Sequence, residues 1–378
     1  MTNLFTPFDA QMMALAFRLA QKGTYSTTPN PHVGCVIVGE NKQVVGEGFH
    51  VKAGQAHAEV NALQQAGTLA KDACAYVTLE PCAHTNRTGP CAKALVNAGV
   101  KRVVIACTDP NPKVAGKGIA ILEQAGILVQ SGLMEEQGKK LNEHFFHRMH
   151  NNKPFVTVKL AASIDGKTAL ENGESKWITS PQARRDVQAQ RASSCAILSG
   201  ADTVIADNPQ LNVRVNELES AIAEQFLWRE QQPLRVIIDS QNRLNAKAYK
   251  LFNDAHPSLV YNLAHNENLN HAQVTQKQLP SIKGGSREFV DLHALMSSLG
   301  ELQINRLWVE GGASLSGALL DHNLVDELII YQAPVLLGKQ GRHLTNFTSP
   351  QVLSNARKGK ITDLTKVGPD IRTTIRFN

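Results

Sequence analysis

Four residues between positions 57 and 91 have the types and the order needed to bind a metal and move protons beside it. His57 and Glu59 are two residues apart, and Cys82 and Cys91 follow downstream. One imidazole and two thiolates supply three zinc ligands, which leaves the fourth tetrahedral position open for a water molecule. We therefore predict a catalytic zinc site with His57, Cys82 and Cys91 as ligands, and with Glu59 as the catalytic group that shuttles protons.

The order of these residues is typical of zinc deaminases, in which the metal activates a water for attack on an amino-bearing ring carbon. One departure is the spacing of the thiols, because that signature places two residues between its cysteines, whereas eight separate Cys82 from Cys91. In the structural alternative, His57 is a helix-face histidine and the cysteines are buried thiols. Each residue alone fits that alternative, but their joint order favours the metal.

The elements around these residues alternate between strand and helix, which favours an α/β fold over a small zinc finger. A helix over 56–65 would carry His57 and Glu59 in its first turn. A strand over 73–79 would deliver Cys82 at its carboxyl end, where open α/β sheets place their sites. A helix from Cys91 would stabilise a thiolate at its N-terminus. The other predicted elements here are helices at 9–21, 116–125 and 135–149 and strands at 33–38, 43–48 and 100–106.

Length and composition indicate how many domains the chain has and in which cellular compartment it lies. The chain has 378 residues and a polar break at 151–154, so we place the boundary near residue 150, with domains at 1–150 and 151–378. The net charge of +6 is spread along the chain, which suits an anionic small molecule better than a nucleic acid. Six cysteines without a disulfide pattern, no signal peptide at the start and no long apolar run indicate a cytoplasmic protein without a membrane partner.

The second half is predicted to form a mostly parallel sheet. The strands are expected at 155–161, 196–199, 234–239, 258–262, 306–310 and 327–333, with a helix over 181–192. Residues 200–204 are expected to begin a turn, and 217–228 and 262–286 are expected to be surface connections. At Gly311 and Gly312 a strand runs into a helix over 315–321. Such a junction binds phosphate through free backbone N–H groups, or it is a plain turn that needs glycine dihedrals. No Gly-x-Gly-x-x-Gly motif indicates a Rossmann site.

Motifs in both halves carry a family resemblance. The first half contains TPNPHVGC (28–35), EPCAH (80–84), RTGPC (87–91) and DPNP (109–112), and the second contains KLAASIDG (159–166), GESKWITS (173–180) and ADNP (206–209). Together they resemble the bifunctional riboflavin-biosynthesis deaminase–reductases, whose wider cysteine spacing matches that of Cys82 and Cys91. The resemblance implies an N-terminal cytidine-deaminase-like three-layer domain followed by a dihydrofolate-reductase-like α/β domain.

The resemblance also implies site residues and cofactors, namely Zn²⁺ and NADPH. Asn30 would lie in the pyrimidine pocket, with His50, His84 and Asp109 as further pocket candidates. Separately from the resemblance, Asp165 is a candidate to orient or protonate the substrate, although aspartate before glycine is also common in turns. NADPH would be contacted by Ala161, Trp177, Thr203, Asp207, Ser240, Gly312, Ala313, Ser314, Leu315, Ser316, Gly317 and Ala318. The ribosylamino phosphate substrate would be contacted by Ser175, Arg191, Leu211, Arg214 and Glu310.

The implied reactions are zinc-dependent hydrolytic deamination of 2,5-diamino-6-(5-phosphoribosylamino)pyrimidin-4-one, then NADPH-dependent reduction of ribosyl to ribityl. The product would be 5-amino-6-(5-phosphoribitylamino)uracil. The alternative is a nucleic-acid-editing zinc deaminase with an accessory nucleotide-binding domain, but only 5% of the residues are aromatic. A non-enzymatic alternative has structural zinc and a nucleotide-sensing module. The expected partner is the small-molecule substrate, and the sequence leaves a homo-oligomer open.

A second metal site is conceivable at His144, His147 and His150, which recur every three residues. Three helical histidines without a nearby carboxylate or cysteine are more often packing residues, so we favour a packing or interdomain role for them.

Overall fold

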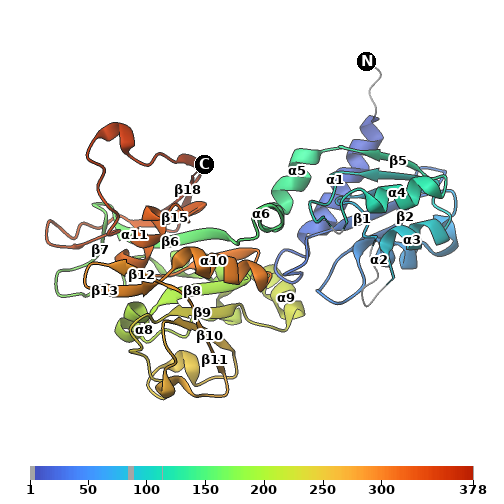
Figure 1. Cartoon of the computed structure of the whole chain (residues 1–378). Helices are drawn as coiled ribbons and strands as arrows, with labels where there is room; N and C mark the ends of the chain where they lie inside the picture. The colour runs from blue at the N-terminus through green and yellow to red at the C-terminus, as the bar shows by residue number, and fades with distance from the viewer. Residues whose placement is uncertain (1–4, 84–88, 113, 378) are drawn as a thin grey trace. The chain divides into compact units, whose positions relative to one another are not determined.

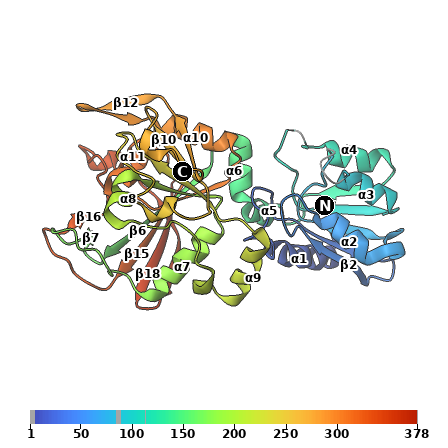
Figure 2. The ribbon, with the colours of Figure 1, turned by 90° about the horizontal axis from the view of Figure 1, so that it is seen from below.

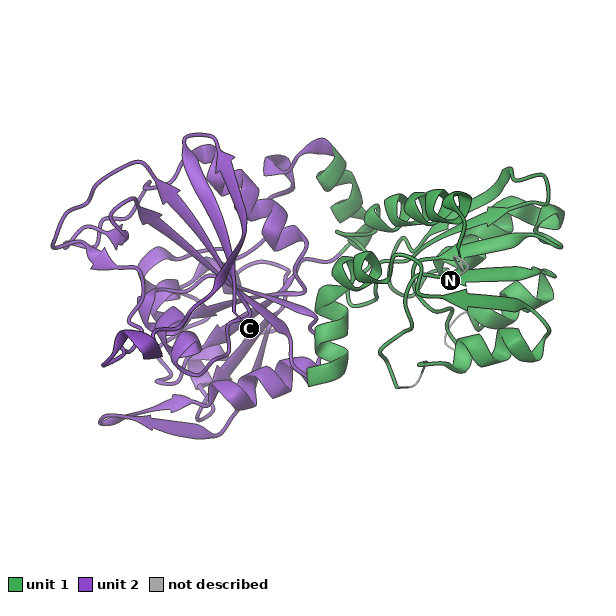
Figure 3. Ribbon diagram, turned by 90° about the horizontal axis from the view of Figure 1, so that it is seen from above, with its two compact units in different colours: residues 1–151, 221–230 green, residues 152–220, 231–378 purple. Residues whose placement is uncertain are grey.

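The computed structural model describes residues 5–83, 89–112 and 114–377. The chain forms two compact units (Figure 3). The first unit contains Met1–Asn151 and also Ala221–Glu230, whereas the second contains Asn152–Ser220 and Gln231–Asn378. The first unit is therefore discontinuous in sequence, because it includes a short segment from the second half of the chain.

The first unit is built on a five-stranded sheet with the order β2-β1-β3-β4-β5 (Figure 1). Strand β1 is antiparallel to both β2 and β3, whereas β3, β4 and β5 run parallel. The strands are β1 (Gly34–Val38), β2 (Val44–Phe49), β3 (Cys74–Val77), β4 (Arg102–Ile105) and β5 (Leu128–Ser131). The helices are α1 (Pro7–Gln21), α2 (Ala58–Ala66), α3 (Cys91–Asn97), α4 (Lys117–Gln124), α5 (Glu135–Leu141) and α6 (Glu143–Asn151).

Helices cover both faces of this sheet, which gives three layers. Alternate residues of a strand point to opposite faces, so Cys35 and Ile37 of β1 pack with α2, α3 and α4. Val36 and Val38 pack on the other face with α1, and Leu141 of α5 lies against the same cluster. The predicted three-layer α/β domain is thus confirmed.

Glycine in the strands lets the helices approach closely. A Cβ at Gly34 would lie 2.0 Å from the carbonyl oxygen of Ala16 in α1. A Cβ at Gly48 would lie 2.3 Å from the carbonyl oxygen of Ala58 in α2. Since α2 carries Glu59 in its first turn, the absence of a side chain at Gly48 sets the distance between this helix and the sheet.

The prediction of a single helix over 135–149 is wrong, because the structure has two helices, α5 and α6, that meet at Asn142. The side-chain oxygen of Asn142 accepts from the backbone N–H of His32 at 2.7 Å, and its amide nitrogen donates to the His32 carbonyl at 2.9 Å. Asn142 is buried and has non-helical dihedrals. The pairing with a distant segment therefore interrupts a pattern that is helical by local sequence.

The second unit contains a nine-stranded sheet with the order β11-β10-β9-β8-β14-β6-β15-β18-β17. Neighbours from β11 to β15 run parallel, and β18 and β17 add antiparallel strands at one edge. The strands are β6 (Phe155–Ser163), β8 (Ala196–Gly200), β9 (Leu234–Ile238), β10 (Ser258–Asn262), β11 (Val274–Gln278), β14 (Arg306–Val309), β15 (Glu327–Ala333), β17 (Lys360–Val367) and β18 (Asp370–Arg376). Two separate two-stranded pairs join β12 (Ser281–Gly284) to β13 (Arg287–Val290) and β7 (Lys167–Ala169) to β16 (Arg342–His343).

Helices also cover both faces of the second sheet, and α7 and α10 lie on opposite sides of it (Figure 2). Helices α10 and α11 pack against one face, whereas α7 and α8 pack against the face that holds Trp308 and Tyr331. The helices are α7 (Pro181–Ala192), α8 (Ala201–Asp207), α10 (Leu292–Glu301) and α11 (Ala313–Asp321), and α9 (Ser220–Arg229) lies within the segment that belongs to the first unit. The predicted mostly parallel α/β sheet is confirmed.

Some local predictions for this half are wrong. Residues 201–207 form a helix, α8, rather than a turn. The expected surface connections contain helix α9 and strands β11 and β12. Strand β11 is an edge strand with mostly exposed polar residues. Backbone hydrogen bonds pair it with β10, and such bonds do not depend on side-chain type. The sequence of β11 therefore has no apolar pattern from which the strand could be predicted.

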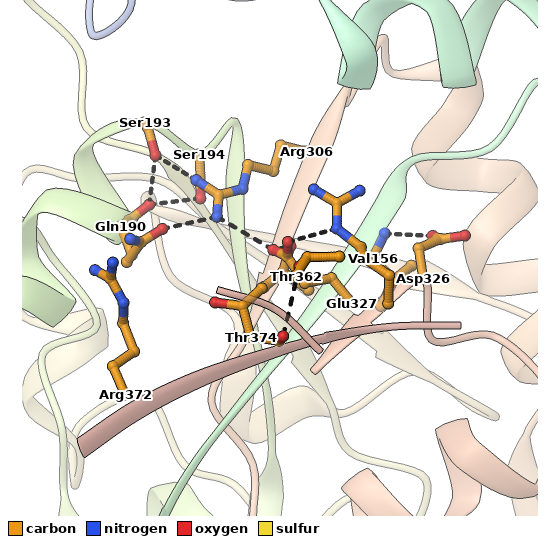
Figure 4. Close-up of polar contacts among 12 residues, drawn as sticks. Val156, Gln190, Ser193, Ser194, Arg306, Asp326, Glu327, Thr362, Arg372 and Thr374 are labelled. Atoms are coloured by element: carbon orange, nitrogen blue, oxygen red, sulfur yellow. Dashed lines mark hydrogen bonds and ion pairs between the residues drawn. The ribbon is translucent and has the colours of Figure 1, made fainter. Parts of the chain in front are cut away.

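Charged side chains are buried at the ends of the central strands where β14 and β15 begin (Figure 4). Glu327 in β15 accepts from the Thr157 hydroxyl at 3.1 Å and pairs with Arg376 Nε at 2.8 Å. Arg306 in β14 donates to Gln190 Oε1 at 2.8 Å and to the Ser193 hydroxyl. These contacts connect the end of α7 to the sheet on the side where the parallel strands start.

Candidate active sites

The three predicted zinc ligands lie together in the first unit. The Nδ1 atom of His57 is 3.2 Å from Cys91 Sγ and 3.6 Å from Cys82 Sγ, and the two sulfurs are 3.3 Å apart. Within the described parts of the chain, these residues form the one group of three or more histidine, cysteine or acidic side chains with metal-binding geometry. His144, His147 and His150 do not form a second such group.

Three separate elements bring these side chains to one point. His57 is the N-cap of α2 rather than part of its first turn, so the helix begins one residue later than its histidine. Cys82 follows β3, and Cys91 is the first residue of α3. The backbone N–H of Cys91 points at Cys82 Sγ at 3.3 Å. Hydrogen bonding by the Cys91 thiol and by His57 lowers the pKa of Cys82 against the opposing effect of burial, which favours a thiolate there.

The donor set and its spacing fit zinc. Zinc bonds of about 2.3 Å to sulfur and about 2.0–2.1 Å to nitrogen place tetrahedral ligand atoms about 3.5–3.8 Å apart. The distances among the three side chains lie close to this range. Two thiolates and one imidazole also leave one coordination position open, as a catalytic site requires.

Glu59 lies beside this cluster in the first turn of α2 and is only 3% exposed. Its Oε2 atom is buried and has no hydrogen-bond partner among the described residues. Burial raises the pKa of Glu59 to about 7, although the nearby His57 opposes the rise. A carboxyl group with this pKa is suited to take up and release a proton near neutral pH.

Asn30 and His50 form a pair next to the cluster. The side-chain Nδ2 of Asn30 is 3.0 Å from His50 Nε2, and His50 Nδ1 is 3.1 Å from the carbonyl oxygen of Ala56. Since a carbonyl can only accept, Nδ1 of His50 carries the proton and its Nε2 accepts from Asn30. Burial lowers the pKa of His50 to about 4, which keeps the ring neutral. The His50 and His57 rings meet edge to face with centroids 5.0 Å apart.

The other pocket candidates differ in position. Asp109 is buried, and its Oδ1 accepts from the backbone N–H of Asn111 at 2.8 Å. Burial raises the pKa of Asp109 to about 6. His84 lies outside the described residues.

Glu80 also belongs to this site, although it was not predicted from the sequence. Its carboxylate accepts from the backbone N–H groups of Gly116 and Gly118 at 3.0 Å each, and from those of Asp109 and Ile119 at 3.3 Å each. These donors lie at and before the start of α4, where backbone N–H groups are free. Glu80 therefore attaches the turn that carries Cys82 to α4. The available signal was an acidic residue that directly precedes the Pro-Cys pair.

A cavity of about 380 Å³ lies in the second unit beside the carboxyl ends of β14 and β6. Eight predicted residues line it: Ala161, Trp177, Thr203, Asp207, Gly312 and Ala313 from the cofactor set, and Ser175 and Glu310 from the substrate set. Gly312 is the N-cap of α11, and its N–H donates to the Thr203 hydroxyl at 3.2 Å. The cavity therefore extends to the start of α11. This is the strand-to-helix junction for which the sequence allowed either phosphate binding or a plain turn.

The remaining predicted residues do not line this cavity. Ser314, Leu315, Ser316, Gly317 and Ala318 continue along α11, where Ser316 and Gly317 are buried. The hydroxyl of Ser240 accepts from the Val290 N–H at 3.0 Å. Leu211 is buried in the core, and Arg214 forms two hydrogen bonds to Glu217, at 2.5 and 3.0 Å.

Arg191 and Glu310 are predicted substrate contacts that pair with each other. Arg191 donates from Nε and Nη2 to the Glu310 carboxylate at 2.5 and 2.8 Å, and Trp308 Nε1 donates to the same carboxylate at 2.8 Å. Burial alone would raise the pKa of Glu310, but the charge and hydrogen bonds of Arg191 outweigh it and lower the pKa to about 2. Glu310 is therefore a fixed carboxylate at the wall of the cavity.

Lys159 and Arg184 also line the cavity, although neither was predicted from the sequence. Lys159 lies two residues before Ala161 in β6, and this alternation places both side chains on the same face. Burial lowers the pKa of Lys159, although the charge of Glu310 opposes this. The Arg184 guanidinium lies 4.3 Å from the centroid of the Trp177 ring. Asp165 instead accepts from the N–H groups of Leu337 and Gly338 and from the Ser163 hydroxyl, so it orders a loop.

The α/β/α fold and the zinc-type cluster of the first unit define a zinc-dependent deaminase, and the second unit adds an α/β domain with its own cavity. Comparison with protein families agrees. Residues 7–107 match the cytidine and deoxycytidylate deaminase zinc-binding region, and residues 154–373 match the RibD C-terminal domain.

The chain belongs to the RibD family of riboflavin-biosynthesis proteins. It is 48% identical over 368 residues to riboflavin biosynthesis protein RibD of Escherichia coli K12, a match that covers 96% of this chain and 98% of the relative. The RibD protein of Haemophilus influenzae is also 48% identical, over 382 residues and 98% of each chain.

Solved structures of the family superpose on the whole chain. Acinetobacter baumannii RibD (form 1) has a TM-score of 0.89 and 45% identity, over 98% of this chain and 99% of that one. A deaminase/reductase of Thermotoga maritima, named for diaminohydroxyphosphoribosylaminopyrimidine and 5-amino-6-(5-phosphoribosylamino)uracil, has a TM-score of 0.83 and 32% identity over the same shares.

The predicted family, fold class and enzyme type are thus confirmed: the chain is a bifunctional deaminase and reductase whose cofactors are zinc and NADPH. The comparisons support this function over a nucleic-acid-editing deaminase.

Proposed function

We propose that residues 1–150 carry the deaminase site and residues 151–378 the reductase site, and that the two act in succession on one metabolite. The first reaction would replace the amino group of 2,5-diamino-6-(5-phosphoribosylamino)pyrimidin-4-one by oxygen and release ammonia. The second would reduce the ribosyl group to ribityl, which gives 5-amino-6-(5-phosphoribitylamino)uracil. The cluster of His57, Cys82 and Cys91 beside a buried, unpartnered Glu59 oxygen is the observation that carries this proposal.

In the deaminase site, His57, Cys82 and Cys91 would hold zinc, which supplies Lewis-acid activation of water at neutral pH. Glu59 would accept the proton of the attacking water, pass it to the ring nitrogen and then assist the departure of ammonia. The unpartnered Oε2 of Glu59 supports this role, because it is free to contact a water or a ring nitrogen. Asn30, oriented by its contact with His50, would bind the pyrimidine.

In the reductase site, NADPH supplies the hydride for the sugar carbon that is bonded to nitrogen. The side chains of Thr203 and Asp207 and the backbone at Gly312 and Ala313 would position the cofactor, since they share one cavity. Glu310 at the wall of that cavity would accept hydrogen bonds from the ribose hydroxyls, and the bidentate contact with Arg191 holds it in place.

Glu59→Gln tests the deaminase assignment. This variant keeps the size of the side chain and removes its base, so ammonia release should fall by at least about a thousandfold. Zinc content and NADPH oxidation with the deaminated intermediate should stay at the wild-type level. Deamination at the normal rate in this variant would show that Glu59 is not the catalytic group.

Gly312→Ala tests the cofactor site. A Cβ at Gly312 would meet only the Thr203 hydroxyl oxygen, at 3.8 Å, so the fold tolerates the methyl group. The group would instead project toward the space assigned to the cofactor, and the KM for NADPH should rise on the order of tenfold. Gly200→Ala is the matched control, because its nearest neighbour is Leu315 Cδ2, also at 3.8 Å, and Gly200 does not line the cavity. Equal NADPH kinetics in both variants would contradict the assignment.

The small-molecule pyrimidine substrate is consistent with the family. Beyond that, we propose that neither nucleic acid nor membrane is a partner and that the protein is cytoplasmic. No disulfide joins any of the six cysteines, which supports a reducing compartment. No helix within the described ranges is long and apolar enough to span a membrane.

We also propose a homo-oligomer. Strand β17 is the last strand of its sheet, and Ile361 and Leu364 on it are 60% and 68% exposed. An edge strand has unpaired backbone N–H and C=O groups, so it can pair with another chain, and these two exposed apolar side chains could join the contact. Light scattering should therefore give a mass above that of one chain, and Leu364→Lys should lower it. A wild-type protein of 41.2 kDa in solution would contradict this proposal.

A further inference from the structure

Helix α9 belongs to the second half of the sequence and to the first unit of the fold. The chain leaves the second unit after Ser220 and returns to it at Gln231 (Figure 3). The return point is anchored in the second unit, because Gln232 Oε1 accepts from the Val213 N–H at 2.7 Å and Gln232 Nε2 donates to the Val213 carbonyl at 3.1 Å. Residues 221–230, which contain all of α9 except Ser220, are themselves part of the first unit.

The contacts of this segment fall on the residues that lead from β2 to the zinc cluster. The Trp228 ring lies 6.0 Å from the ring of Phe49, the last residue of β2. Glu230, the residue after the end of α9, forms an ion pair with Lys52. Phe49 is held from two other directions, because its carbonyl accepts from Asn61 Nδ2 of α2 at 2.9 Å and Lys22 lies 5.9 Å from its ring centroid.

Between Phe49 and α2, the chain carries His50, which contacts Asn30 of the proposed pyrimidine site. His50 directly follows Phe49, and its backbone N–H donates to the Val33 carbonyl at 2.9 Å. The His50 ring then contacts Asn30 on one side and the Ala56 carbonyl on the other, immediately before His57. A shift of Phe49 or Lys52 would therefore be transmitted to Asn30, His50 and His57 within one short segment.

From this continuity we infer that α9 is a positioning element of the deaminase site, with Trp228 and Glu230 as its positioning residues. The inference rests on the proposed deaminase function. Two of the metal ligands, His57 and Cys91, lie at the starts of α2 and α3, whereas His50 lies in the segment that Trp228 and Glu230 contact. Loss of the α9 contacts should therefore weaken substrate binding more than it slows the chemical step.

The test uses the full-length zinc enzyme. In Trp228→Ala, the KM for the diaminopyrimidinone substrate should rise on the order of tenfold, with a smaller change in kcat. Zinc content and NADPH oxidation with the deaminated intermediate should stay at the wild-type level. Trp228→Phe should restore most of the affinity, since an aromatic ring can still contact Phe49. Leu227→Ala is the matched control, because this neighbouring side chain is 61% exposed, and its deaminase kinetics should equal those of the wild type.

The ion pair gives a second test that does not depend on core packing, because Glu230 is 72% exposed. Lys52→Glu alone should raise the deaminase KM through repulsion of Glu230, and adding Glu230→Lys should reverse the rise. Unchanged KM values in Trp228→Ala and in Lys52→Glu, with normal zinc content, would overturn the inference. If the wild-type enzyme with zinc released no ammonia at all, the proposed function would fail instead, which the same assays distinguish.

Discussion

At Glu80, a single carboxylate accepts four backbone hydrogen bonds, three from Gly116, Gly118 and Ile119 around the start of α4 and one from Asp109. The residue precedes the Pro-Cys pair by one position and is buried. A carboxylate has two oxygens and no hydrogen, so it can satisfy several N–H donors at once. Glu80 therefore holds the turn that presents Cys82 and is not a member of the metal-ligand group.

Glu80→Gln tests this role. The amide would place an NH₂ group against N–H donors, so buried donors would lose their partner at a cost of about 2–3 kcal/mol in the free energy of unfolding of the first unit. Zinc affinity should fall about 10- to 100-fold, as is usual for residues that orient a ligand. Competition with a chromophoric chelator measures this affinity. Glu123→Gln, at an exposed position of α4, is the control and should change neither the free energy of unfolding nor the zinc affinity. Wild-type zinc affinity in the Glu80 variant would contradict the role.

The Glu310 carboxylate should make the free energy of unfolding of the second unit depend on pH. Its pKa is about 2 in the folded protein, against an ordinary value of 4.5. A carboxylate with a lowered pKa stabilises the fold above its unfolded pKa, and this contribution is lost as the pH falls from about 4.5 toward 2. The urea midpoint of the second unit should therefore decrease over this window.

Glu310→Gln should make that decrease shallower and should lower the midpoint at neutral pH, since the buried Arg191 loses its charged partner. The exposed Glu219→Gln is the control and should keep the wild-type profile. A Glu310→Gln profile with the same acid slope as the wild type would show that this pair does not cause the pH dependence.

Among the elements, α2 depends most directly on the strand beneath it. Gly46 and Gly48 of β2 face this helix, and a Cβ at either position would lie within 2.3 Å of an α2 carbonyl oxygen. The residues of α2 on that side are alanines at 58, 62 and 66, all buried. Small side chains on both surfaces thus set the height of the helix that carries Glu59 above the sheet.

Gly48→Ala should displace the start of α2, because the new Cβ would lie 2.3 Å from the Ala58 carbonyl and 2.5 Å from the Ala62 nitrogen. Such overpacking costs about 1–3 kcal/mol. The deaminase rate should fall together with the stability of the first unit, whereas NADPH oxidation should be unchanged. In Gly39→Ala, the nearest neighbour of the new Cβ is a Val45 methyl group at 3.3 Å, so this variant should have a smaller effect on unfolding. Equal unfolding free energies for the two variants would contradict this account of α2.

On the scale of the whole molecule, each unit has its own sheet, its own apolar clusters and its own candidate site. The two cofactors bind to different units, so each should stabilise the unit that holds it. A ligand that binds only the folded state raises its stability in proportion to the logarithm of its concentration over Kd.

Removal of zinc by a chelator should lower the unfolding temperature of the first unit by about 5–10 °C if zinc is present at about a hundred times its Kd. The second unit should keep its unfolding temperature, and NADPH should raise only that one. Differential scanning calorimetry with and without each cofactor resolves the two effects. A chelator that shifts both transitions equally would show that the units do not unfold independently.

The residues of the zinc cluster could be predicted from the sequence because a metal site restricts both the types of its residues and their spacing. The alternation of strand and helix, the two strands that form β1 and β2 and the strand-to-helix junction at Gly312 were also predictable, since each depends on local apolar patterns and on glycine. The family resemblance then supplied the reductase fold, which no local motif specifies.

Tertiary structure alone decided the features that depend on partners far apart in the chain. Asn142 breaks a predicted helix because its amide pairs with the backbone of His32. Arg191 faces Glu310, and Glu80 binds the start of α4, although neither partner lies near in sequence. Helix α9 joins the first unit by contacts to Phe49 and Lys52. The sequence by itself determined which side chains could do the chemistry, because that depends on residue type and local order. Only the folded chain decided what holds them, because hydrogen bonds and packing join segments whose separation in sequence carries no signal.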